Sequence, residues 1–277
     1  MREQIETGSF VSAPGVPVRP DMIRMISWNI NRGEQLDAVL GFLSSVGPDL
    51  ILLQETDVNA ARTHYRNIAR EIAQTLRMNY VFGCEFEELT QGDRHSPAYH
   101  GQATLSRLPL SASRIVRFGS QSGFWRPRWF IPKIGPFQRR LGARMALVSH
   151  VEWFEKQLVV YNVHLESRSS DALRYDQLAE IFNDARQFSS EVPAIVAGDF
   201  NLDLSEKAVG SMISDAKFNN PFHSGKAHQT TMPSRLRRSR AIDWILTRGP
   251  LDCAEPDLHD SVCASDHYPL SLSLLCK

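Results

Sequence analysis

The stretch from Pro193 to Leu202 constrains the fold of this chain more than any other. Its first five residues, ending at Ala197, are mostly apolar and predict a strand that is buried on both faces. Gly198 follows, and then come Asp199 and Asn201, whose spacing of two points both side chains the same way in an extended backbone. Polar side chains at the end of a buried strand are a common placement for active sites in layered α/β proteins. Gly, Asp and Asn are also common in simple turns, so other stretches of the sequence must decide between an active site and a turn.

The composition predicts an ordinary globular protein. The chain has 277 residues, of which 42% are hydrophobic, enough to form one large core. Its net charge of zero argues against a globally basic nucleic-acid coat but leaves room for local patches. The four cysteines show no metal-binding spacing and are expected to be reduced thiols. No apolar run approaches the length of a transmembrane segment, and the N-terminus lacks a signal-peptide pattern, so we expect a cytoplasmic monomer.

The hydrophobic pattern predicts strands that alternate with helices in one domain over residues 22–277, after a flexible arm at 1–21. One helix is expected to begin near 36 and to end at Gly47-Pro48, and a second is expected within 62–77. Two more are expected from about 171 to 187 and near 205–215. Strands are expected at 23–30, 49–55, 79–86, 101–106, 111–118, 143–152, 157–165, 193–197, 242–246 and 267–275. The segment 119–142 contains three prolines and no clean period, and it is expected to be a loop.

Polar residues recur at the ends of these predicted strands. Glu55 alone could be a surface carboxylate, and His164 alone could be a core histidine bonded to the backbone. Asp243 lies between Ile242 and Trp244, and an acid inside an apolar strand needs a partner because burying it unpaired is costly. Because polar residues recur at strand ends along the whole chain, a shared functional site explains them better than a separate structural role for each. The full set is Asn29, Glu55, Asn162, His164, Asp199, Asn201, Asp243, Asp266 and His267.

The chemistry of the set matches the hydrolysis of phosphate esters. Glu55, Asn29 and Asp266 offer hard oxygen ligands, which suit Mg²⁺ or Mn²⁺ better than zinc. Such a metal polarises a phosphoryl oxygen and helps to stabilise the leaving oxygen. His267 beside Asp266 can supply an imidazole that titrates near neutral pH, and Asp243 is a plausible partner to fix its tautomer.

The remaining polar residues suit the water and phosphate steps of the same reaction. Asp199 can orient or deprotonate the attacking water. Asn201 and His164 can donate hydrogen bonds to the phosphoryl oxygens, where charge builds up. Asn162, two residues before His164, is included among the candidate catalytic residues.

Seven motifs in order resemble the endonuclease/exonuclease/phosphatase superfamily, which has the DNase I-like fold. They are Trp28-Asn-Ile30, Gln54-Glu-Thr56, Gly101-Gln-Ala-Thr-Leu-Ser-Arg107, Asn162-Val-His-Leu165, Gly198-Asp-Phe-Asn201, Ile242-Asp243 and Ser265-Asp-His267. The resemblance runs from about residue 23 to the C-terminus. It implies a four-layer α/β/β/α sandwich of two mixed β-sheets flanked by helices, with the site at one edge. It also implies metal binding by Glu55 with Asn29 and Asp266, and a pair of Asp243 with His267.

A basic and aromatic segment leaves the substrate open. Between Ser111 and Val151 the chain has eight Arg or Lys residues and no acid, with Phe and Trp interleaved. The segment fits a nucleic-acid backbone with stacked bases, a lipid interface, or aromatic side chains that simply pack inward beneath solvated arginines. The basic loop 235–240 precedes the strand of Asp243 and should lie near the site. The candidate substrate-binding residues are Arg128, Trp129, Arg144 and Arg240.

Three functions therefore remain at this stage. The first is a Mg²⁺-dependent phosphodiesterase acting on nucleic acid, that is, a nuclease. The second is a phospholipid phosphodiesterase of the sphingomyelinase-like kind that recognises a headgroup, and the third is a binding module for nucleic acid or lipid without catalysis. The complete set of polar residues favours an enzyme over the binding module.

Overall fold

Two mixed β-sheets form the centre of the computed structural model, which describes residues 5–11, 19–93, 95–127, 130, 140–222, 228–234 and 238–276. The larger sheet has eight strands in the order β1-β4-β5-β3-β2-β13-β12, with β7 also paired to β4. These strands are β1 (Ile5–Ser9), β2 (Met22–Arg32), β3 (Leu50–Val58), β4 (Asn79–Glu88), β5 (Ala98–Ser106), β7 (Arg140–Gly142), β12 (Leu251–Leu258) and β13 (Leu270–Cys276). The pair β2–β3 is parallel and its neighbours are antiparallel.

The smaller sheet has five strands in the order β11-β10-β9-β8-β6. They are β6 (Leu110–Arg117), β8 (Met145–Trp153), β9 (Lys156–His164), β10 (Ala194–Asp199) and β11 (Asp243–Arg248). The strands β9 and β10 run parallel, and β11 runs antiparallel to β10. As expected from its apolar letters, β10 is buried at every position.

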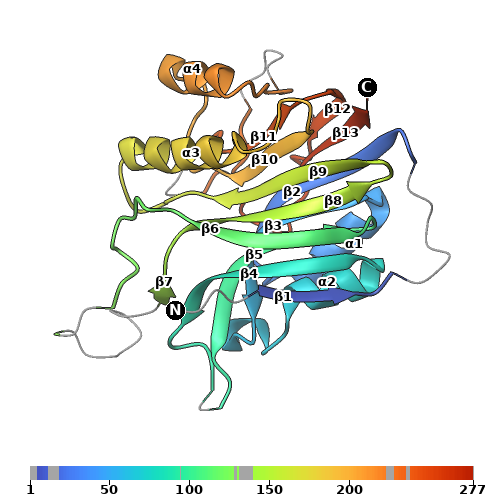
Figure 1. Ribbon diagram of the computed structural model, residues 1–277. Helices are drawn as coiled ribbons and strands as arrows, with labels where there is room; N and C mark the ends of the chain where they lie inside the picture. Colours follow the sequence, from blue (N-terminus) through green and yellow to red (C-terminus); the bar gives the residue numbers. More distant parts are fainter. Residues whose placement is uncertain are drawn as a thin grey trace.

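Helices cover the outer face of each sheet (Figure 1). The helices α1 (Leu36–Val46) and α2 (Ile68–Leu76) pack on the larger sheet, while α3 (Asp171–Ala185) and α4 (Lys207–Asp215) pack on the smaller one. A third apolar cluster lies between the sheets, where Leu52 of β3 and Val160 of β9 belong to the same core. This arrangement confirms the predicted four-layer sandwich. None of the helices in the described part is long and apolar enough to cross a membrane.

Three segments differ from the sequence-based expectation. Residues 5–9, expected in a flexible arm, form the edge strand β1, which pairs with β4 and places Glu6 on the hydroxyl of Tyr80. The strand β12 was not expected, and β7 lies inside a predicted loop. The helix expected within 62–77 is α2, which begins after a 3₁₀ turn at Ala61–Thr63, where Asn67 caps it by accepting a hydrogen bond from the amide of Arg70.

Candidate active site

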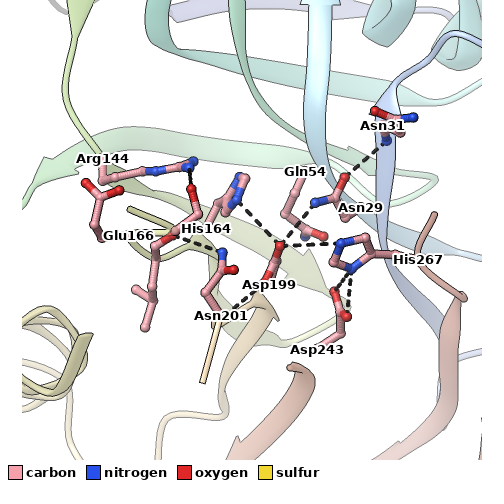
Figure 2. A network of polar contacts seen from close by, with 12 residues as sticks. Asn29, Asn31, Gln54, Arg144, His164, Glu166, Asp199, Asn201, Asp243 and His267 are labelled. Carbon is pink, nitrogen blue, oxygen red and sulfur yellow. Dashed lines mark hydrogen bonds and ion pairs between the residues drawn. The ribbon is translucent and has the colours of Figure 1, made fainter. Parts of the chain in front are cut away.

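Three adjacent strands of the smaller sheet bring three of the predicted residues side by side. The parallel register of β9 and β10 places His164 opposite Asp199, and the antiparallel register of β10 and β11 places Asp199 opposite Asp243. All three side chains are at most 2% exposed. Because β10 ends where β11 begins, the polar ends of these strands meet at one edge of the sandwich (Figure 2).

Asp199 is the central carboxylate of the site (Figure 2). It accepts hydrogen bonds from the side-chain amide of Asn29 at 3.1 Å and from the backbone amide of Asn201 at 2.8 Å. The Nε2 atoms of His164 and His267 lie 3.5 and 3.9 Å from its Oδ2 atom. Burial, together with the nearby charge of Asp243, raises the pKa of Asp199 to about 7. Asp199 is therefore suited to exchange a proton near neutral pH.

Asp243 and His267 form the pair that the sequence led us to expect. The Nδ1 atom of His267 lies 2.8 Å from Oδ2 and 3.1 Å from Oδ1 of Asp243, and the hydroxyl of Thr230 donates to the same carboxylate at 2.6 Å. Burial favours the neutral imidazole, but the Asp243 carboxylate outweighs it and, with Asp199, raises the pKa of His267 to about 10. His267 is thus a cation at neutral pH, with Nε2 directed towards Asp199.

His164 has the opposite electrostatic environment. Burial and the positive charge of Arg144 hold its pKa well below the usual value for histidine, so the imidazole is neutral. Its Nδ1 atom is buried, has no hydrogen-bond partner among the residues that the structure describes, and lies 4.0 Å from the carboxylate of Glu85. The two histidines beside Asp199 therefore differ in charge, one being neutral and the other protonated.

Glu85 and Arg144 form a buried ion pair behind His164. The Nη1 atom of Arg144 donates to both oxygens of Glu85, at 3.1 and 3.2 Å, and Nη2 donates to the hydroxyl of Ser167. Arg144 is 2% exposed, so this candidate substrate-binding residue is buried beside the site and bonded to its own protein. Burial raises the pKa of Glu85 to about 7 in spite of the arginine.

Glu55 follows the apolar part of β3, at an irregularity in the strand pairing. Its φ of 52° is left-handed, and the register with β2 and β5 shifts around it. Burial opposes ionisation, but the charges of His100 and of the arginines Arg32, Arg140 and Arg144 offset it and lower the pKa of Glu55. The lowered pKa keeps this carboxylate ionised, and no hydrogen bond or ion pair joins it to another of the described residues. A β-bulge beside a functional group is a recurrent way to re-aim a side chain.

The other two proposed metal ligands are Asn29 and Asp266. The Oδ1 atom of Asn29 accepts a hydrogen bond from the backbone amide of Asn31, which fixes the orientation of its side chain (Figure 2). Asp266 is exposed, and the hydroxyl of the preceding Ser265 binds the backbone oxygen of Asn29 at 2.7 Å. The donor set is an ionised carboxylate, an amide oxygen and an exposed carboxylate, which fits the hard-oxygen preference of Mg²⁺ or Mn²⁺.

Asn162 is placed differently from the other candidate catalytic residues. Its side-chain nitrogen donates to the backbone oxygens of Leu53 and Ala103 in the larger sheet, at 3.1 and 2.9 Å. Its oxygen accepts from the side chain of Gln54 at 2.8 Å. The residue is fully buried, and its amide joins the two sheets beneath the site.

The basic residues near the site are mostly paired internally. Arg62 and Arg140 both bind Glu88, and Arg62 also binds Asp57, whose carboxylate contacts His100. By contrast, Arg240 is exposed, and its guanidinium donates to the backbone oxygen of Asn201 at 3.3 Å. Two further candidates, Arg128 and Trp129, lie outside the described residues.

Several residues of the site were not expected from the sequence. Glu85 and Asp57 are acids within apolar strands, the same signal that singled out Asp243, and that signal could have found them. Thr230 and Glu166 carry no comparable signal, because their roles depend on which loop folds against which strand.

Comparison with known proteins agrees with this arrangement. Residues 26–267 match the model of the Endonuclease/Exonuclease/phosphatase family. The match covers most of the chain, and the chain belongs to that family. No curated protein matches it by sequence.

Solved structures with low sequence identity share the fold. An endonuclease/exonuclease/phosphatase from Beutenbergia cavernae is similar with a TM-score of 0.66 and 18% identity over 92% of this chain and 72% of that one. The human Nocturnin catalytic domain with a bound sulfate anion gives 0.64 and 18% over 100% and 97%. TDP2 from C. elegans gives 0.62 and 16% over 95% and 78%.

Proposed function

We propose that this protein is a metal-dependent phosphodiester hydrolase and, within that class, a nuclease. The observation that carries the proposal is the arrangement around Asp199, where a carboxylate with a pKa of about 7 lies between a protonated and a neutral histidine.

The residues divide the reaction among them. Asp199 positions the attacking water and takes its proton, which its pKa near 7 allows at neutral pH. His267 donates from Nε2 to a phosphoryl oxygen where negative charge develops, while Asp243 fixes the ring and stabilises its positive charge. Asn201 and the neutral His164 donate further hydrogen bonds to the phosphoryl oxygens. Glu55, Asn29 and Asp266 would hold Mg²⁺ or Mn²⁺, which polarises a phosphoryl oxygen and stabilises the leaving oxygen.

Two exposed arginines support a polyanionic substrate. Arg240 lies on the Asn201 side of the site, and Arg168 lies four residues after His164. Neither makes an ion pair with a carboxylate in the described part of the chain. Exposed cations beside a phosphodiester site attract and orient a phosphate backbone.

One observation favours a phospholipid diester as the second candidate. Phe124 and Phe130 are 58% and 61% exposed in the basic segment that follows β6. Exposed aromatic side chains beside arginines also suit a lipid interface with anionic headgroups.

A nucleic-acid cleavage assay that compares the wild type with a variant of one metal-binding carboxylate tests the proposal. Purified protein with Mg²⁺ should cleave single- or double-stranded DNA or RNA, and EDTA should stop the reaction. Glu55→Gln should lower kcat at least about 100-fold because it removes the charged metal ligand. Exposed Glu155→Gln, in the β8–β9 turn, should keep wild-type activity.

The same assay decides between the candidates. Turnover of sphingomyelin or another phospholipid, with no cleavage of any polynucleotide, would replace the nuclease by the lipid enzyme. Wild-type activity of Glu55→Gln would remove the proposed metal site.

A further inference from the structure

The first part of the basic segment, residues 119–126, is fastened to the end of β9. The hydroxyl of Ser122 donates to Glu166 at 2.7 Å, and the indole nitrogen of Trp125 donates to the same carboxylate at 3.0 Å. The side chain of Gln121 bonds both the amide and the carbonyl of Arg144. Glu166 is fully buried and comes two residues after His164, so this segment is held against the active site.

Phe124 is displayed from this anchored segment. Its ring is 58% exposed, and it contacts Trp125 edge-on with the ring centroids 4.8 Å apart. The backbone amide of Phe124 donates to the hydroxyl of Ser122, which restrains the backbone that carries the ring. A large apolar ring that is both exposed and held in place suits the binding of a flat partner.

Arg168 lies over the same ring. The carbon of its guanidinium group is 5.7 Å from the ring centroid of Phe124, and its backbone amide donates to Glu166 at 2.8 Å. Arg168 is exposed and makes no ion pair with a carboxylate among the described residues, whereas Arg140 and Arg144 are bonded to Glu88 and Glu85. The cation over Phe124 is therefore available to an anionic ligand.

We propose that Phe124 and Arg168 form a subsite for an unpaired nucleobase and its phosphate, next to the phosphodiester that is cleaved. The base stacks on Phe124, and Arg168 binds the backbone phosphate. This subsite selects single-stranded over double-stranded nucleic acid, because bases in a duplex are already stacked on their neighbours. The inference rests on the proposed function and names the substrate class of the same site.

The geometry favours a base over a membrane as the occupant. Membrane insertion needs a protruding apolar surface that enters the acyl region. Phe124 instead packs edge-on against Trp125, whose indole donates to the buried Glu166, and the guanidinium of Arg168 lies over the same ring. The backbone amide of Arg168 donates to Glu166 as well, so both neighbours of the ring are held at that carboxylate. That arrangement offers one ring with a cation beside it, which matches a base and its phosphate.

Binding measured in EDTA, where the substrate stays intact, tests the subsite. Fluorescence anisotropy would compare a single-stranded thymidine oligonucleotide with an abasic oligonucleotide of the same length and charge. Phe124→Leu should weaken binding of the thymidine strand at least about fivefold, and should reduce the difference in affinity between the two strands. Arg168→Gln should weaken both strands by a similar factor.

The control variant is Phe154→Leu. Phe154 is 54% exposed, and it lies in the β8–β9 turn ten residues before His164, about 30 Å away along an extended strand. Its substitution should change neither affinity.

Three results would overturn the subsite. They are an equal effect of Phe124→Leu on both strands, no effect on either, or no binding of the thymidine strand by the wild type. If Phe124→Leu lost binding to phosphatidylserine vesicles while its affinity for both oligonucleotides stayed unchanged, the ring of Phe124 would be assigned to membrane binding instead. Mg²⁺-dependent cleavage of the abasic strand by the wild type tests the proposed function separately, since that substrate has no base to stack.

Discussion

Asp199, His164 and His267 show how burial and neighbouring charge set different protonation states within one small site. Burial lowers the pKa of His164, whereas the paired carboxylate of Asp243 raises that of His267. The sequence led us to expect an imidazole that titrates near neutral pH at His267. The structure gives a cation there, because two carboxylates face the ring, and it moves the group that titrates near pH 7 to Asp199.

Glu85 should make the stability of the protein depend on pH. Its folded pKa is about 7 against an ordinary value of 4.5, so between these values the folded chain keeps a proton that the unfolded chain has released. The free energy of unfolding should therefore fall as pH rises through this window, by up to about 3 kcal/mol from this group. Glu85→Gln should flatten that slope in urea denaturation measured from pH 4.5 to 7.

The comparison variant for this experiment is Glu152→Gln, on the half-buried part of β8. It should keep the wild-type slope. Parallel curves for Glu85→Gln and the wild type would show that burial does not raise the pKa of Glu85.

For individual residues, the sequence predicted which polar side chains lie together when they occur in a short motif at the end of a strand. Asp199, Asp243 and His267 lie together as expected, because strand ends of neighbouring strands meet at one edge. The use of Asn162 between the sheets, and of Arg144 in a buried ion pair, could not be predicted. Both depend on which side chain lies opposite in another strand, and local sequence does not carry that information.

Gly198 lets β10 approach β9 closely just before Asp199. A Cβ atom at this position would lie 2.0 Å from the backbone oxygen of Val163, and the φ of 144° disfavours other residues. Gly198→Ala should therefore separate the two strands, cost at least about 2 kcal/mol of unfolding free energy and reduce activity by displacing Asp199. Chemical denaturation and a nuclease assay would measure the two effects.

Gly210 provides the matched control for that substitution. It lies within α4, and a Cβ atom there would contact nothing within 4 Å. Gly210→Ala should raise stability by about 0.5–1 kcal/mol, because alanine loses less conformational freedom in a helix. Similar effects of the two alanines would contradict the close approach at Gly198.

The elements predicted from sequence are the ones that contribute to a core. The strand β10 is a continuous apolar run and the helix α3 has an amphipathic period, and both formed as expected. The strands β1 and β12 lie at the two edges of the larger sheet, where one side lacks a neighbour. Their residues are largely polar and partly exposed and show no periodicity, and Pro256 within β12 argues against a strand.

The two sheets are joined by a polar connection as well as by an apolar core. Asn162 of β9 satisfies two backbone oxygens of the larger sheet and is fully buried. Asn162→Leu should cost at least about 2 kcal/mol of unfolding free energy, because it leaves those oxygens and the Gln54 amide without partners. Denaturant titration would measure the loss.

Asn79 tests whether the cost comes from crossing between the sheets. Its side chain also donates to two backbone oxygens, those of Ser106 at the end of β5 and of Leu108 in the loop that follows, but it is half-buried and does not bond the other sheet. Water can replace these bonds, so Asn79→Leu should cost less than half as much. Equal costs would show that Asn162 has no special place in the assembly.

The pairing of β2 with β13 brings together residues that leave the ribosome at different times during synthesis. The strand that carries Asn29 pairs with the last strand, and the indole of Trp28 binds the backbone oxygen of His267, 239 positions further along. A nascent chain emerging from the ribosome lacks this neighbour of β2 until β13 has been synthesised. The polar residues around Asp199 therefore come together only after His267 has been made, and a chain that stops short of it lacks the imidazole that pairs with Asp243.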